Sequence, residues 1–324
     1  MRLFHTAKLT ALASAVLLAL AILAGSVPAA AAPADYFRLV ILADTHLPAK
    51  GFQNLDPTRQ QKVIATKNKI IDDINAWTDV GEVVVVGDVV ADTGTAAEYA
   101  FAAQYFFRLE KPVAFVTGNH DYIYTDDLGP GGRLIRADAA TRAAKLSRFQ
   151  ETFGQPALYY SQKVADYLLV FLSVDSLDSP HLAQVSGRQL EWLRDELAQN
   201  PAVPTVIFFH APLDGTLSDY NKTVNTPSFI AQPAEPLQEL IAANPQILLW
   251  VSGHTHTPAT NPDFASAINI YGGRLINIHN ADLGRETIWT NSLYLYADKI
   301  VIKTFNHKTA SWVDELERTV PVAR

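Results

Sequence analysis

Five short polar clusters, each following an apolar run, contain most of the side chains that could carry chemistry. They are Asp44-Thr45-His46, Gly87-Asp88, Gly118-Asn119-His120-Asp121, His210 and Gly253-His254-Thr255-His256. Five of the chain's 9 histidines fall in them. Carboxylate, imidazole and amide ligands without a thiolate suit Mn, Fe, Zn or Co rather than a soft-metal or iron–sulfur site. The clusters therefore predict a hydrolase site with two divalent or trivalent transition-metal ions.

Two neighbouring metal ions need a ligand that both of them share. An aspartate serves this purpose because each of its oxygens can bind one ion, at the roughly 3.5 to 4 Å separation of two-metal phosphoryl-transfer sites. His254 and His256 can reach both ions if their backbone is irregular, and we expect the preceding Gly253 to permit that turn. A single-zinc site would need only three protein ligands and an open position, which is fewer than the clusters offer.

Apolar runs rich in Val, Ile and Leu alternate with amphipathic stretches, which predicts an α/β protein. Runs that are apolar on both faces favour strands covered on both sides. The expected strands are 37–42, 82–86, 113–116, 167–174, 205–209, 247–251 and 275–278. Asp44, Asp88, Asn119, His210 and His254 each lie at or just after the end of one of these strands. Ligands bind at the carboxyl ends of strands in open α/β sheets, so we expect these five residues to converge.

Helical spacing of apolar residues predicts helices over 56–77 and 186–199. Ser186 and Gln189 predict a capping box at the start of the second helix. A closing antiparallel pair of strands is expected around Asp298, from 289–296 and 300–305. Three stretches without clear periodicity, 122–136, 212–236 and 257–274, follow clusters and are expected to form the walls of the pocket.

The five clusters, taken in order, resemble the motifs of the calcineurin-like metallophosphoesterases: D-x-H, G-D, G-N-H-[DE], a lone His and G-H-x-H. The motifs extend from Asp44 to His256 and so cover most of the chain. The resemblance implies a four-layer αββα sandwich, in which two mixed β-sheets are flanked by helices. It also implies hydrolysis of a phosphate ester by in-line attack of a hydroxide that bridges the two metals.

The resemblance assigns a role to each site residue. The first metal would be held by Asp44, His46, Asp88 and His256, and the second by Asp88, Asn119, His210 and His254, with Asp88 as the bridge. His120 matches the family's catalytic histidine, which contacts the phosphate and protonates the leaving oxygen. Asp121 would orient the His120 ring.

The sequence differs from the motifs of two branches of this family, which makes both branches less favoured for this protein. Asp88 is followed by Val89-Val90-Ala91, so the tyrosine by which purple acid phosphatases bind their ferric ion is missing. Protein Ser/Thr phosphatases have Asp-Arg-Gly at the second motif and a Glu after the catalytic histidine. Here Asp88 is followed by Val89 and His120 by Asp121, so both features are missing. The sequence therefore favours small-molecule substrates over proteins.

Three further histidines match no motif. We interpret His181, His279 and His307 as surface or structural residues. For His279, which follows a predicted strand, a position in the pocket wall is the alternative. Asp175 also follows a strand, and a role in a turn is expected for it.

The N-terminus has the features of a signal peptide: Arg2 and Lys8 precede an uncharged stretch that ends in small residues. We expect cleavage after Ala31, which gives a signal peptide at 1–31, a phosphoesterase domain at 32–324 and a secreted or periplasmic protein. An uncleaved anchor is the alternative, but Gly25, Ser26 and Pro28 interrupt the run. The chain has no cysteine, which excludes a lipid-modified Cys and a disulfide framework.

Charge restricts the partners of the exported part. Its 24 basic and 33 acidic residues give a net charge of −9, which opposes a long nucleic acid. A small phosphorylated substrate remains favourable because metal cations would dominate the local field. We expect no stable membrane insertion after cleavage, and the sequence is silent on oligomeric state.

Two classes of function remain open. The first is an exported phosphoesterase acting on a phosphodiester or nucleotide-like small molecule, with a phosphomonoesterase or nucleotidase as its close alternative. The second is a non-catalytic binding module on the same scaffold. The complete set of candidate ligands together with His120 favours the enzyme.

Overall fold

The computed structural model describes residues 35–284 and 287–323 of the 324-residue chain. The expected signal peptide, residues 1–31, lies outside the described residues. Among the helices that are described, none is both long and apolar enough to cross a membrane.

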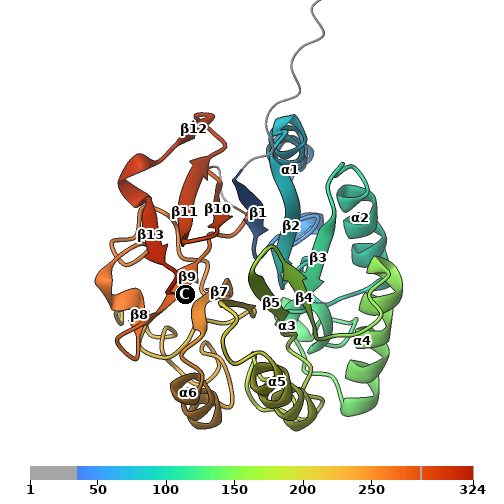
Figure 1. The fold of residues 1–324 in the computed structure, drawn as a ribbon. Helices are drawn as coiled ribbons and strands as arrows, with labels where there is room; N and C mark the ends of the chain where they lie inside the picture. Colours follow the sequence, from blue (N-terminus) through green and yellow to red (C-terminus); the bar gives the residue numbers. More distant parts are fainter. Residues whose placement is uncertain (1–34, 285–286, 324) are drawn as a thin grey trace, which may run out of the picture. The chain divides into compact units, whose positions relative to one another are not determined.

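The first sheet is mixed and has seven strands (Figure 1). Its hydrogen-bonded order is β12-β11-β10-β1-β2-β3, and β13 also pairs with β11. The strands are β1 (Tyr36–Leu42), β2 (Val80–Val86), β3 (Val113–Val116), β10 (Trp289–Tyr296), β11 (Lys299–Asn306), β12 (Ser311–Trp312) and β13 (Arg318–Pro321). Because β1, β2 and β3 run parallel, their carboxyl ends lie at one edge of the sheet.

The second sheet is also mixed and has six strands, in the order β4-β5-β6-β7-β9-β8. They are β4 (Tyr160–Val164), β5 (Tyr167–Phe171), β6 (Thr205–Phe208), β7 (Ile247–Ser252), β8 (Ile270–Tyr271) and β9 (Leu275–His279). The central strands β5, β6, β7 and β9 are parallel, so this sheet also gathers its carboxyl ends at one edge.

Helices cover the outer faces of both sheets (Figure 1). They are α1 (Pro57–Ala76), α2 (Ala96–Phe106), α4 (Ala139–Phe153), α5 (Gly187–Gln199) and α6 (Ala234–Ala243). The four-residue helix α3 (Asn119–Tyr122) instead follows β3 at the carboxyl edge of the first sheet. Single 3-10 turns lie at Phe52–Asn54, Pro130–Gly132, Ala267–Asn269 and Asp314–Leu316. The first sheet packs against α1 and α2, and the second packs against α5 and α6.

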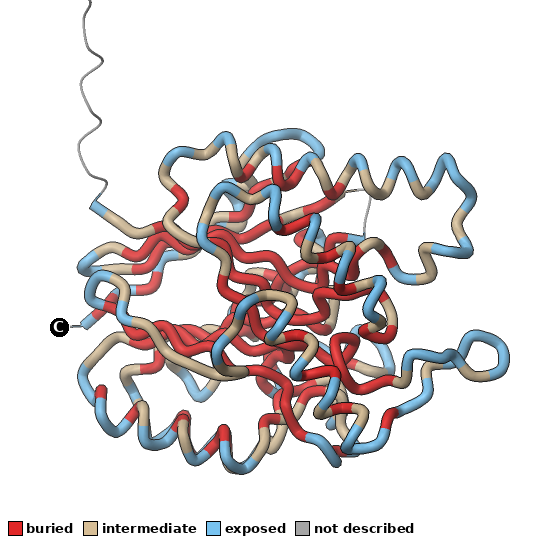
Figure 2. Tube along the Cα trace, turned by 90° about the vertical axis from the view of Figure 1, so that its right-hand side faces the viewer, coloured by how far each residue is buried: buried red, intermediate tan, exposed pale blue. Residues whose placement is uncertain are grey.

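Successive side chains of one strand enter different cores, which explains the continuous apolar runs. In β1, Leu39 and Ile41 point into the core between the two sheets, whereas Val40 and Leu42 pack under the helices. Figure 2 shows the resulting burial, with buried positions concentrated along the strands. This is the period-2 geometry of a strand buried on both faces, and it confirms the expected four-layer αββα sandwich.

The structure contains the expected strands and both expected helices, although β5 ends at Phe171 rather than at residue 174. Strands β4, β8, β12 and β13 and helices α2, α3, α4 and α6 were not expected. The capping box at Ser186 is only half formed. Its hydroxyl accepts the Gln189 N–H, whereas the Gln189 side chain binds the backbone of Ser173. Helix α2 was not expected, although Thr95 and Glu98 form a complete capping box at its start.

Candidate metal centre

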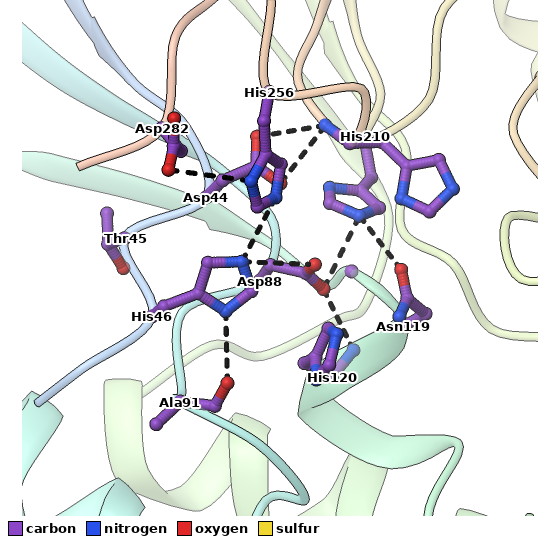
Figure 3. A network of polar contacts seen from close by, with 12 residues as sticks. Asp44, Thr45, His46, Asp88, Ala91, Asn119, His120, His210, His256 and Asp282 are labelled. Carbon is purple, nitrogen blue, oxygen red and sulfur yellow. Dashed lines mark hydrogen bonds and ion pairs between the residues drawn. The ribbon is translucent and has the colours of Figure 1, made fainter. Parts of the chain in front are cut away.

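The seven expected metal ligands come together at the facing carboxyl ends of the two sheets (Figure 3). Strands β1, β2 and β3 of the first sheet lead into Asp44, Asp88 and Asn119. Strands β6 and β7 of the second sheet lead into His210 and the His254–His256 turn. The expectation of convergence at the strand ends therefore has a direct structural basis.

The ligand atoms form two groups that share Asp88. In the group of Asp44, His46, Asp88 and His256, the potential ligand atoms lie within 4.8 Å of one another, and the same holds for Asp88, His210 and His254. Asn119 joins the second group, because its Oδ1 lies 3.2 Å from His210 Nε2. The arrangement suits two metal ions that share one carboxylate.

Five of these candidate ligands occupy an uncommon backbone conformation. Eight non-glycine residues in the described part of the chain have a positive φ, and among them are Asp44 (49°), His46 (41°), Asp88 (50°), His254 (65°) and His256 (50°). Such conformations cost free energy and cluster at functional sites. These five residues lie in the turns that follow β1, β2 and β7, and their potential ligand atoms lie close together.

Two glycines in the motifs allow close approach rather than an unusual turn. A Cβ at Gly253 would lie 2.3 Å from Asp44 Oδ2, and a Cβ at Gly118 would lie 2.3 Å from Asp88 Oδ1. Neither glycine has a positive φ. The expectation that Gly253 permits the turn by its conformational freedom is therefore wrong: the left-handed residues are the histidines themselves.

Three histidine rings are fixed by hydrogen-bond acceptors at Nδ1. His46 Nδ1 lies 3.1 Å from Ala91 O, His210 Nδ1 lies 3.0 Å from Val86 O, and His256 Nδ1 lies 3.5 Å from an oxygen of Asp282. A proton held at Nδ1 leaves the Nε2 lone pair for a metal, and such outer contacts are typical of metal-binding histidines. In each ring Nε2 points to the other candidate ligands.

The fourth ring, that of His254, is held through Nε2 instead of Nδ1. Its Nε2 lies 3.0 Å from Ser228 O, which leaves Nδ1 to face the centre. The Phe229 ring stacks on it at 4.8 Å. The expected pocket wall 212–236 thus contributes directly to the second group of ligands.

Charge in the centre is balanced by protons when no metal is present. Burial alone would lower the pKa of His210, but Asp88 and Asp44 outweigh it and raise the pKa to about 9. Burial would also lower the pKa of His256, but the carboxylates of Asp44 and Asp282 outweigh burial and raise this pKa to about 10. Burial would raise the pKa of Asp88, yet the neighbouring imidazoles hold it well below its usual value. The donor set therefore attracts cationic charge, which fits metal ions in place of these protons.

His120 lies beside this centre without belonging to either ligand group. Its backbone N–H donates to Asp88 Oδ1 at 2.8 Å, and its ring meets the His46 ring edge-on at 5.0 Å. Its Nδ1 lies 2.7 Å from Asp92 O, so Nε2 is the nitrogen left to meet a substrate. Burial lowers the pKa of His120.

The partner of the His120 ring differs from the expected one. Asp121 uses its two oxygens to accept backbone N–H groups of Val89, Val90 and Gly118, whereas the ring is oriented by the Asp92 carbonyl. Burial, followed by the charge of Asp88, raises the pKa of Asp121 to about 7. Asp121 thus shapes the loop around Asp88 rather than the imidazole.

Sequence reasoning missed two charged groups that support the centre, Lys67 and Asp282. Lys67 in α1 is buried, and its ammonium donates to Thr45 O at 2.6 Å and to His46 O at 2.8 Å. Burial lowers its pKa to about 7. The available sequence signal was a lysine three positions before Ile70, on the apolar face of the helix expected over 56–77.

Two of the three remaining histidines in the described residues, His279 and His307, have hydrogen-bond partners. His279 is fully buried, and its Nε2 lies 3.1 Å from Thr216 O. His307 is also buried, between Asp73 and Thr290. Asp175 accepts the N–H and hydroxyl of Ser186 at the start of α5. Its side chain therefore holds the start of a helix 11 residues further along the chain, rather than a local turn as expected.

The family model for the calcineurin-like phosphoesterases matches residues 37–258. The chain belongs to this family and is a hydrolase that acts on phosphoester bonds. A comparison with curated protein sequences finds no match.

Solved structures with the same fold are remote in sequence. A dimetal phosphatase from Danio rerio is 15% identical with a TM-score of 0.59, over 89% of this chain and 99% of that one. A purple acid phosphatase from yellow lupin seeds is 14% identical with a TM-score of 0.57, over 88% and 54%. GAP50 of Plasmodium, described as the anchor in the inner membrane complex, is 12% identical with a TM-score of 0.54, over 89% and 90%. At these identities the likeness concerns the fold alone.

Proposed function

We propose that this protein is an exported phosphoesterase that uses a dinuclear metal centre to hydrolyse a small phosphodiester or nucleotide-like molecule. The observation that carries the proposal is the shared carboxylate of Asp88, which belongs to both groups of potential ligands. When bound, the two metals would supply Lewis-acid activation of a water nucleophile and charge neutralisation on the phosphoryl oxygens. Asp44, His46, Asp88 and His256 would hold the first metal, and Asp88, Asn119, His210 and His254 the second.

The role of His120 in this proposal is proton donation to the leaving oxygen. The contact of Nδ1 with Asp92 O fixes the ring, and Nε2 is the nitrogen that would carry the transferred proton. Burial favours the neutral ring, so binding of an anionic substrate next to it is expected to promote protonation. This favours an enzyme over a binding module, because a module that only held the metals would need no such ring.

A substrate panel tests the activity. The protein is reconstituted with Mn²⁺, Fe²⁺, Zn²⁺ or Co²⁺ and assayed on p-nitrophenyl phosphate, bis-p-nitrophenyl phosphate, cyclic nucleotides and glycerophosphodiesters. We expect faster turnover of the diesters, dependence on added metal, and loss of at least about 100-fold in Asp88→Asn, since changes outside the ligand set already cost about 10- to 100-fold. Equal turnover after chelation would contradict the proposal, and two bound metals without turnover of any substrate would favour the binding module.

Export rests on the N-terminal sequence and is tested separately. The full chain is expressed in a bacterial host with an intact secretion pathway, and the N-terminus of the product is read by mass spectrometry. We expect a mature chain that begins at Ala32 in the periplasm or medium. A full-length chain retained in the membrane would show the uncleaved anchor instead.

A further inference from the structure

A carboxylate lies behind the His256 ring, on the side away from the other candidate ligands. His256 Nε2 lies 3.1 Å from Asp44 Oδ1 and 3.2 Å from His46 Nε2. On the opposite side of the ring, Nδ1 lies 3.5 Å from Asp282 Oδ2 (Figure 3). The Asp282 residue is only 8% exposed, so water competes little for its charge.

The backbone holds Asp282 against the loop of the first motif. Ala43 and Asp282 form a parallel β-bridge, and the Leu283 N–H donates to Asp44 O at 3.2 Å. Asp282 follows β9 and lies beyond residues 37–258, the part of the chain that the family model matches. Asp282 is therefore not part of the five motifs.

We propose that Asp282 is a positioning residue that directs the Nε2 lone pair of His256 to the first metal and strengthens His256 as a ligand. This inference rests on the dinuclear centre proposed above. A carboxylate at Nδ1 keeps the proton on that nitrogen, fixes the ring orientation and increases the basicity of the ligating nitrogen. His46 and His210 have neutral backbone carbonyls at the same position, so the anionic partner distinguishes His256.

Metal affinity, measured by competition with a chromophoric chelator, tests the role. In Asp282→Asn we expect the affinity of the first metal to fall by about 10- to 100-fold, while the second metal binds as in the wild type. The weakened step should be the one that His46→Ala abolishes. Asp282→Glu, which keeps the charge, should recover part of the loss.

A matched control removes the carboxylate from another aspartate–histidine pair. Asp73 Oδ2 lies 2.8 Å from His307 Nδ1, away from the centre, so Asp73→Asn should leave both metal affinities unchanged. Wild-type affinities in Asp282→Asn, or equal losses in Asp282→Asn and Asp282→Glu, would overturn the positioning role alone. A wild-type protein that binds no metal would overturn the proposed centre and this role together.

Discussion

The carboxylate of Asp44 accepts the backbone N–H of His254 at 2.9 Å and thereby joins residues that are 210 positions apart. The contact connects the loop after β1 in the first sheet with the loop after β7 in the second. Gly253 makes it possible, because any side chain there would meet the same carboxylate. The first and last motifs are thus one structural unit.

Replacing Gly253 by alanine should disrupt this unit. The added Cβ would lie 2.3 Å from Asp44 Oδ2, so the carboxylate or the His254 turn must move. We expect Gly253→Ala to lose the first metal and to reduce turnover by about 100-fold or more, as misplaced reacting groups do, with the fold retained by circular dichroism. Gly187→Ala is the control, since a Cβ at Gly187 meets nothing within 4 Å. Normal metal binding in Gly253→Ala would show that the close contact is not required.

Replacing His120 separates proton transfer from metal binding. His120→Asn keeps the backbone N–H that donates to Asp88 but removes the imidazole. We expect kcat to fall by about 10² to 10⁴-fold, the usual contribution of general acid–base catalysis, while metal content stays at two ions per chain. His181→Asn serves as a control outside the centre. Loss of metal together with activity would mean that His120 is a ligand instead.

The fold was largely predictable because its strands are buried on both faces. A run such as Leu39 to Leu42 must be apolar at every position, since alternate side chains enter different cores. Such a run can be recognised in a single sequence. Strand β4 was missed because its Tyr160–Val164 residues are partly exposed and include polar side chains. Short edge strands carry little such signal.

The convergence of the candidate ligands was predictable from the sequence, but the network of contacts around them was not. The residue types of the motifs indicate metal binding, whereas the outer partners are identified only by where the chain places them. Asp282 carries no motif and follows β9 by three residues, and Asp92 acts through its carbonyl, which every residue possesses. The positive φ of residues such as His254 was not predicted either, because Asp and His adopt it more often than most residues but still rarely.

Metal binding should release protons at neutral pH. Without metal, the pKa values of about 9 for His210 and about 10 for His256 keep both rings protonated, and a metal requires the neutral nitrogen. Raised pKa values favour the proton as pH falls, so metal affinity should decrease about tenfold per released proton for each pH unit below 9. Calorimetry at pH 7.5 in buffers of different ionisation enthalpy should report at least two protons per pair of metals, one from each of these rings and a further one where a metal-bound water ionises. Buffer-independent heats would contradict these pKa values.

Lys67 should stabilise the loop that contains Asp44, Thr45 and His46. Its ammonium donates to the buried carbonyls of Thr45 and His46. In Lys67→Met both carbonyls lose this donor, and each buried carbonyl left without a donor costs about 1 to 3 kcal/mol of stability. We therefore expect the free energy of unfolding to fall by about 2 to 6 kcal/mol and the first metal to bind more weakly. Lys69→Met, two residues further along α1, removes only a surface pair with Asp73, which is worth about 0.3 to 0.5 kcal/mol. Urea unfolding of both metal-free variants makes the comparison, and equal losses would show that Lys67 has no special role in holding the loop.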